Sequence, residues 1–312
     1  MNITLPDGSI RKLESGSTGL DLANSIGPGL AKAAIAIEVN GSQKDLCDSI
    51  MEDSEVSIIT IDSDEGLEIM RHTLTAQVLA RAVKNLYPDT KLAIGPTITD
   101  GFYYDFEFKK PISTEDLEAI EKEMKKVIAT NSSIIKSLHS REDAIKVFKS
   151  EKEPYKESII EDSDQEDNFQ LYYQEDSKFV DLCRGPHLPN LKHIGSFKLT
   201  KLAGAYWKGD SKNKMLTRIY GTAWKNDKDL NAYIHSIEEA EKRDHRKLGK
   251  EMDLFHFQEE APGMVFWHSN GWTIYRNLRN FVRKRLQDSG YIEVNTPQVI
   301  DRKLWEASGH WD

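Results

Sequence analysis

The sequence has very few cysteines, no long apolar run and no excess of basic residues. Its 312 residues include only Cys47 and Cys183, which excludes a disulfide framework and favours a reducing compartment. No apolar stretch approaches the roughly 20 residues that a membrane-spanning helix requires. The first residues also lack the basic and apolar regions of a signal peptide. We therefore expect a cytoplasmic protein with no membrane partner.

Several common functional motifs are missing as well. The sequence contains no Walker A loop, no dinucleotide-binding glycine fingerprint and no G-x-S-x-G element, so it offers no recognisable nucleotide phosphate site. A net charge of −9 argues against a protein that coats nucleic acid through its overall field. The content of 38% hydrophobic and 30% charged residues is typical of a soluble protein with a substantial core.

Local signals divide the chain into four regions and predict a multidomain α+β fold. Residues 1–62 are predicted to form a small α/β unit, with a hairpin turn at Asp7-Gly8 and a helix that Ser17 or Thr18 caps. Residues 67–225 are predicted to begin with one long helix that Pro88 ends. Strands and a further helix follow, and a capping box at 113–116 opens that helix.

The last two regions are predicted to be mainly helical. Residues 226–250 are charged and helical, which is typical of a linker helix. Residues 251–312 contain a strongly amphipathic helix, a strand at 291–297 and the beginning of another helix. About 60 residues with one strand are too few for a sheet core of their own, so this region should dock on something or be part of a larger domain.

The stretch DLCRGPH, residues 181–187, carries the first candidate chemistry. Cys183 and His187 flank Gly185-Pro186, which predicts a tight loop. A cysteine and a histidine on one loop supply half of a zinc site, or they move protons beside a substrate, or they close a loop without further function. The residues alone leave these three interpretations open.

His72 lies on the predicted long helix and is the candidate for the opposite half of the site. A second histidine four residues later would share its face, but that position is Ala76. Gln77 would lie about 140° away on an α-helix. The zinc interpretation therefore lacks a ligand, and we expect no metal here. Lys156 is the remaining candidate, although local sequence alone favours a solvated lysine there.

A basic stretch with interleaved aromatic residues, 197–225, is a candidate RNA surface in an otherwise acidic chain. Cations bind phosphates and aromatic rings stack on unpaired bases. The alternative is a solvated sheet edge with its aromatic residues in the core. The candidate tRNA-binding residues are Lys198, Lys201, Tyr206, Trp207, Lys208, Lys212, Lys214 and Arg218.

The sequence as a whole resembles the N-terminal part of bacterial-type threonyl-tRNA synthetases. The resemblance rests on LPDGS, MRHT, GPTITDGFYYDFEF, DLCRGPHLPN, LAGAYWKGDSKNKMLTRIYGTAW and EAPGMVFWHSNGWTIY, in that order, and covers essentially all residues. It implies a β-grasp-like TGS domain at 1–62 and an α/β tRNA editing domain at 67–225. It further implies a linker helix at 226–250 and the start of a class II catalytic domain, with motif 1, at 251–312.

The resemblance also implies a function. The full-length enzyme attaches threonine to its tRNA with ATP, magnesium and zinc, whose ligands would lie beyond residue 312, and it forms a homodimer through motif 1 around Pro297. The part in hand needs no cofactor, binds tRNA for threonine and hydrolyses mischarged seryl-tRNA. The family positions that match the editing site are His72, Tyr104, Lys156, Asp181, Cys183 and His187.

One departure from the family pattern leaves two alternatives. The editing helix usually carries H-x3-H, whereas this chain has one extra residue and Gln77 where the second histidine would fall. A non-catalytic RNA-binding module made of TGS and editing-like domains is therefore the main alternative. An alanyl-type editing domain with a zinc site is the second.

Overall fold

The computed structural model describes residues 1–297 and 301–311. The chain forms two compact units, Met1–Tyr233 and Ile234–Asp312. Each unit combines helices with small sheets, which agrees with the predicted multidomain α+β class. Residues 298–300, within the segment that resembles motif 1, lie outside the described residues.

A five-stranded sheet and two short helices form the N-terminal part of the first unit. The strands lie in the order β2-β1-β5-β3-β4, with bounds β1 Asn2–Thr4, β2 Ile10–Lys12, β3 Ala34–Val39, β4 Ser42–Asp45 and β5 Ser54–Thr60. The Asp7-Gly8 turn joins antiparallel β1 and β2, as predicted. Thr18 and Asp21 form a capping box at the start of α1 (Gly19–Ile26), and α2 (Pro28–Ala33) follows. A core around Ile3, Leu22 and Ile37 holds these elements together.

The long helix predicted after residue 67 is not α-helical throughout. It consists of α3 (Asp64–Thr73), a π-helical segment (Leu74–Leu79) and α4 (Ala80–Leu86). A π-helix closes its hydrogen bonds at i→i+5, so each hydrogen-bonded loop contains one more residue than in an α-helix. A segment of this kind can accommodate an extra residue like the one that the family resemblance indicates, and α4 follows directly after it.

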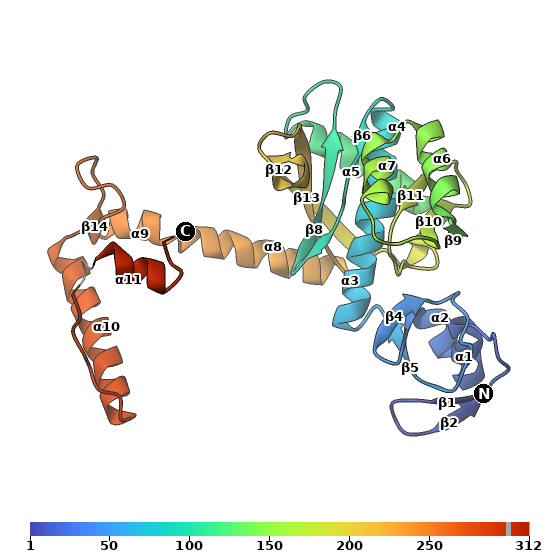
Figure 1. Ribbon diagram of the computed structural model, residues 1–312, viewed down its shortest axis with the longest axis horizontal. Coiled ribbons are helices and arrows are strands. Elements are labelled where there is room, and N and C mark those ends of the chain that lie inside the picture. The colour runs from blue at the N-terminus through green and yellow to red at the C-terminus, as the bar shows by residue number, and fades with distance from the viewer. Residues whose placement is uncertain (298–300, 312) are drawn as a thin grey trace. The chain divides into compact units, whose positions relative to one another are not determined.

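A second sheet packs against this rod of helices (Figure 1). Its order is β12-β13-β8-β6, with β7 also on β8, and its helix α5 spans Asp116–Ala129. The strands are β6 Lys91–Leu92, β7 Thr97–Ile98, β8 Gly101–Glu107, β12 Ser196–Tyr206 and β13 Met215–Trp224. The predicted capping box at 113–116 is half formed. The backbone N–H of Ser113 donates to Asp116, whereas the Ser113 hydroxyl accepts from Glu115 instead of capping the helix.

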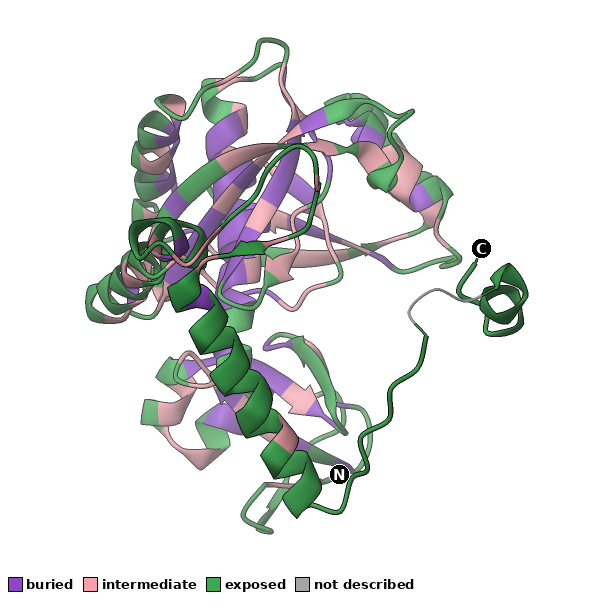
Figure 2. Cartoon of the chain, turned by 90° about the vertical axis from the view of Figure 1, so that its left-hand side faces the viewer, coloured by how far each residue is buried: buried purple, intermediate pink, exposed green. Residues whose placement is uncertain are grey.

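A three-stranded sheet, in the order β11-β10-β9, completes the first unit. Its strands are β9 Ile134–His139, β10 Phe169–Gln174 and β11 Val180–Leu182. Helices α6 (Arg141–Glu151) and α7 (Pro154–Glu161) cover it through Phe148, Ile160 and Phe169. Figure 2 shows the buried segments gathered in the sheets and their covering helices.

The C-terminal part of the chain differs from two of the predictions. The predicted linker helix is two helices, α8 (Asp227–Lys242) and α9 (His245–Glu251), because Asp244 caps a new helix start. The predicted strand at 291–297 is irregular, since no neighbouring strand pairs with it among the described residues. The remaining elements are β14 Phe255–His256, β15 Phe266–Trp267, α10 Ser269–Asp288 and α11 Arg302–Ala307. Among the described residues, every helix is too short or too polar to cross a bilayer.

Candidate functional site

A cavity of about 420 Å³ lies where the helical rod, α7 and the loop after β11 meet. Pockets of a few hundred Å³ are of the size that binds small ligands or single substrate groups. The wall includes side chains from each of these elements. It is lined by His72, Ala76, Ile94, Gly95, Pro96, Tyr104, Lys156, Ile159, Ser163, Gln165, Phe169, Gln170, Asp181, Leu182, Cys183 and Arg184.

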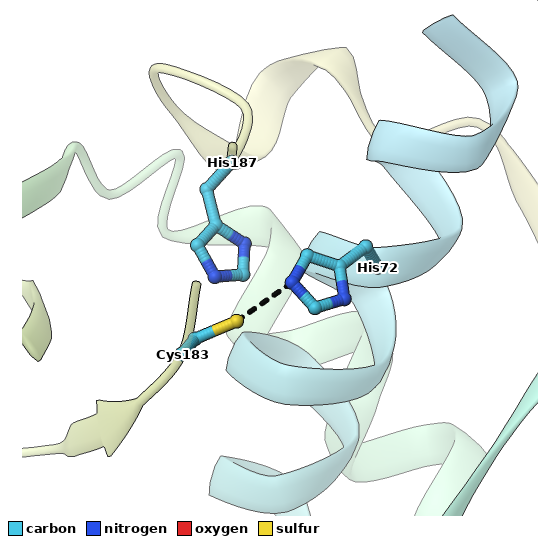
Figure 3. A group of neighbouring side chains, drawn as sticks. All are labelled: His72, Cys183 and His187. Carbon is cyan, nitrogen blue, oxygen red and sulfur yellow. Dashed lines mark hydrogen bonds between the residues drawn. The ribbon is translucent and has the colours of Figure 1, made fainter. Parts of the chain in front are cut away.

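Two histidines and a cysteine converge beside this cavity (Figure 3). His72 comes from α3, while Cys183 and His187 come from the loop after β11. The Nε2 atom of His72 lies 2.7 Å from the Cys183 sulfur, and the His72 and His187 rings stack with centroids 4.6 Å apart. The fold thus brings together residues that are more than 100 positions apart in the chain.

Thr73 fixes the orientation of the His187 ring. Its hydroxyl accepts from the backbone N–H of Leu188 at 2.9 Å and lies 3.1 Å from Nδ1 of His187. We assign the hydroxyl proton to the contact with Nδ1, which places the ring proton on Nε2. That Nε2 atom is buried and has no hydrogen-bond partner among the described residues. Its hydrogen-bonding capacity is thus unused by the described part of the protein, although His187 does not itself line the cavity.

A buried ion pair forms a second part of the wall. Lys156 Nζ lies 2.5 Å from Asp181, and both side chains are buried. Asp181 also accepts from the Tyr104 hydroxyl at 3.2 Å and from the backbone N–H of Leu182 at 2.8 Å. Burial raises the pKa of Asp181, and the ammonium group of Lys156 opposes that rise. The local expectation of a solvated Lys156 is therefore wrong, because α7 points this side chain into the interior.

Burial also sets the charge of His72. Desolvation lowers its pKa, although the carboxylates of Asp181 and Asp45 act in the opposite direction. The ring is consequently neutral near pH 7 and can accept a proton.

The helix side of the site offers no second imidazole. Ala76 is the residue that lines the cavity four positions after His72. Gln77 is buried elsewhere, where its backbone carbonyl and side-chain oxygen accept from Gln174 at 2.6 and 3.2 Å. At this position the helix therefore presents an apolar side chain to the cavity.

The donor set of His72, Cys183 and His187 is of the kind that binds zinc, and its ligand atoms lie within 4.8 Å of one another. Its geometry does not fit a metal. Sulfur and nitrogen ligands on tetrahedral zinc are about 3.5 Å apart, whereas here they are in hydrogen-bond contact at 2.7 Å. The two imidazole planes are stacked at 11°, so a metal in the plane of one ring would lie outside the plane of the other. The arrangement is that of a hydrogen-bonded group.

The basic stretch 197–225 lies on β12, β13 and the turn between them, and none of its residues lines the cavity. Four of its cations are already paired, Lys208 with Asp162, Lys214 with Glu107, Arg218 with Asp105 and Lys225 with Asp62.

The remaining residues of the stretch differ in how accessible they are. Lys201 lies over the Tyr220 ring, and Trp207 packs edge-on against Tyr155. Tyr206 is 43% exposed. Lys198 and Lys212 are exposed and have no ion pair among the described residues. A smaller set of cations is therefore available to a phosphate backbone than the composition of the stretch indicates.

Thr73, Tyr172 and Arg184 contribute to the site but are not among the residues that the sequence predicted. Thr73 holds the His187 ring, Tyr172 packs edge-on against it at 4.3 Å, and Arg184 lies at the cavity wall. Arg184 carries a usable signal, since it is the cation inside DLCRGPH. Thr73 and Tyr172 carry none, because their roles depend on contacts between distant elements.

Replacing Lys156 by methionine should destabilise the protein by about 3–5 kcal/mol, because Asp181 would remain buried without its partner. Urea unfolding measures this loss. Lys122→Met is the matched control, since Lys122 pairs with Glu118 on the exposed face of α5 and should cost less than about 1 kcal/mol. Equal losses in the two variants would show that the buried pair has no special role.

Sequence comparisons show which known proteins this chain is similar to. Residues 1–60 match the TGS domain, and residues 170–220 match the threonyl and alanyl tRNA synthetase second additional domain. The chain is 54% identical over 310 residues to a threonine–tRNA ligase of Prochlorococcus marinus (strain MIT 9211), which covers 99% of this chain and 48% of the relative.

Two further relatives give the same result. Threonine–tRNA ligases of Psychrobacter arcticus and Aromatoleum aromaticum are each 53% identical, over 99% and 100% of this chain and 48% of their own lengths. The chain thus spans about half the length of the curated relatives that it matches. Its sequence and its two matched domains group it with the N-terminal part of the threonyl-tRNA synthetases.

Proposed function

We propose that residues 67–225 hydrolyse seryl esters of the tRNA for threonine, and that the chain acts within a threonine–tRNA ligase. The observation that carries this proposal is the cavity walled by His72, Cys183 and the buried Lys156–Asp181 pair. In the whole ligase, ATP, magnesium and zinc would serve the aminoacylation reaction, tRNA for threonine would be the partner, and segments around Pro297 would form a dimer.

The choice of substrate follows from the limits of binding selectivity. Serine keeps the hydroxyl group of threonine and lacks only one methyl group. A missing methyl group is worth roughly 1–3 kcal/mol in a binding pocket, which is too little for accurate translation. A ligase for threonine therefore needs a second, hydrolytic site. The volume of this cavity is suited to one amino acid and part of the terminal ribose.

The reaction is attack of water on the ester carbonyl carbon. Neutral His72 accepts the proton of the water molecule, and the Nε2–H group of His187 donates to the oxygen that becomes negatively charged. The carbon–oxygen bond to the ribose then breaks, serine leaves, and protonated His72 returns its proton to the ribose oxygen. Lys156 and Asp181 hold the opposite wall in place, with the Tyr104 hydroxyl on the same carboxylate.

A covalent route through Cys183 is the alternative within the same site. The contact between Cys183 and His72 is the geometry of an activated thiol. A thiolate is, however, a better leaving group than a ribose alkoxide, so the adduct would return to the ester more readily than it would expel the tRNA. Direct attack by water is therefore the preferred mechanism.

The decisive measurement is the release of labelled serine from mischarged tRNA by the purified chain. The wild-type chain should release serine, and His72→Asn should lower the rate at least 100-fold, as loss of a general base does. Cys183→Ala should keep the rate within about 10-fold, because the thiol is not the nucleophile. A far larger loss in Cys183→Ala would instead establish the covalent route.

The same assay separates this proposal from a non-catalytic RNA-binding module, which the missing second histidine favours. Ala76→His restores a histidine at the cavity wall, four residues after His72. If the wild-type chain binds tRNA but releases no serine while Ala76→His does, the chain itself is a binding module and the hydrolysis proposal fails.

The rate of serine release should depend on the protonation of His72. Because burial lowers its pKa below the usual 6.5, more than half of the His72 rings are still neutral at pH 6.5. After subtraction of the spontaneous hydrolysis rate, the enzymatic rate should fall to half of its plateau only below pH 6.5. A half-maximal rate above pH 6.5 would assign the base to a different group.

Binding of tRNA should depend on the exposed cations of the β12–β13 hairpin that make no ion pair among the described residues. Reversing the charges of Lys198 and Lys212 together should weaken binding and reduce the slope of log K against log salt by about 1.4, as expected for two single-strand contacts. Lys146→Glu with Lys149→Glu on α6 is a control with the same change in net charge. Similar effects of both pairs would mean that only overall charge matters.

A further inference from the structure

Asp45 is a buried carboxylate that the N-terminal sheet contributes to the surroundings of the site. It ends β4, and only 5% of it is exposed to solvent. Its partners belong to the sheet β11-β10-β9 and to the DLCRGPH loop, all within the unit Met1–Tyr233. A buried carboxylate is costly unless hydrogen bonds and opposite charge compensate it.

Three donors satisfy the two oxygens of Asp45. The backbone N–H of His187 donates to Oδ1 at 2.8 Å, and the hydroxyl of Tyr172 donates to Oδ2 at 2.7 Å. The ammonium group of Lys136 lies 3.0 Å from Oδ2. Burial and the charge of Asp45 raise the pKa of Tyr172, which keeps its hydroxyl protonated as a donor.

These contacts lead directly to the imidazole of His187. The Tyr172 ring that Asp45 holds packs edge-on against the His187 ring, with centroids 4.3 Å apart. The loop closes tightly over the pair, because a Cβ added at Gly185 would lie 2.1 Å from the Tyr172 hydroxyl. Tyr172 also pairs across the sheet with Asp181, so the same strand position borders both halves of the site.

We infer that Asp45 is a positioning residue for the hydrolytic site and that the N-terminal domain thereby sets the orientation of the His187 ring. Asp45 fixes the backbone of His187 and the Tyr172 ring, and Thr73 fixes Nδ1 from the other side. The Nε2 atom, which has no hydrogen-bond partner among the described residues, is the free end of the ring that these contacts hold. Asp45 itself does not line the cavity. The inference rests on the proposed hydrolysis, in which that group stabilises the oxyanion.

Asp48 provides a matched control three residues away. Both of its carboxylate oxygens lie 2.8 Å from Lys136, so it contributes to the contact between the N-terminal sheet and β9. It makes no hydrogen bond to His187 or Tyr172, and its Oδ2 accepts from the backbone N–H of Asp45 at 3.1 Å. Asp48→Asn keeps an oxygen that can accept from Asp45 and removes the charge that faces Lys136, so it weakens the domain contact while it leaves the bonds from Asp45 to His187 and Tyr172 in place.

The test compares Asp45→Asn and Asp48→Asn in the whole 312-residue chain. The first readout is the NMR spectrum of the chain with isotope-labelled histidine rings, in which His187→Asn identifies the His187 signals. The second readout is kcat and KM for serine release. Asp45→Asn should shift the His187 ring signals and lower kcat on the order of 10- to 100-fold with KM within 2-fold of wild type. Asp48→Asn should change neither.

The outcomes separate this inference from the proposed function. Unchanged His187 signals in Asp45→Asn, or equal effects of the two variants, would overturn the positioning role. A wild-type chain that releases no serine would refute the hydrolysis proposal, while the NMR comparison would still decide whether Asp45 orients the ring. If Asp45→Asn does not fold, Tyr172→Phe removes one of the Asp45 bonds and should shift the same signals, and an unshifted spectrum would equally overturn the inference.

Discussion

The buried ion pair between Lys156 and Asp181 is the interaction on which the candidate site depends. It joins α7 to β11 in the interior, where an unpaired charge of either sign would be costly. With this pair in place, α7 covers the cavity and the end of β11 directs the DLCRGPH loop toward α3. The Tyr104 hydroxyl extends the same network into the larger sheet. The pair thus holds three elements of the fold around one small volume.

The π-helical segment offers a way for the helix side to accommodate the extra residue that the family resemblance indicates. One extra residue in an α-helix would rotate all following side chains by about 100° and disrupt the packing of α4. Residues Leu74–Leu79 widen to i→i+5 hydrogen bonds, and α4 keeps its buried face against the sheet. At the cavity wall this segment presents Ala76, which offers no polar group. The proposed hydrolysis therefore relies on His72 and on the loop residues.

Local signals in the sequence were sufficient for much of the fold. The Asp7-Gly8 hairpin and the Thr18 helix cap form as predicted, because a turn or a cap is decided by neighbouring residues. The prediction of a strand at 291–297 is wrong because a strand depends on a distant partner. The periodicity of the local sequence does not reveal whether such a partner is present. The prediction of a single linker helix is also wrong. The cap at Asp244 divides it, and Asp244 is one polar residue among many in that region.

The sequence by itself determined which residues are candidates. Short motifs such as DLCRGPH pointed to them, and the longer segments carried the resemblance to a family. Only the tertiary structure decided how they act together. It buried Lys156 against Asp181, set His72 beside Cys183, directed Gln77 away from the cavity and brought Asp45 from the N-terminal sheet to the backbone of His187. The physical reason is that burial and hydrogen bonding between residues far apart in the chain fix charge, tautomer and orientation. None of these is a property of a local stretch of sequence.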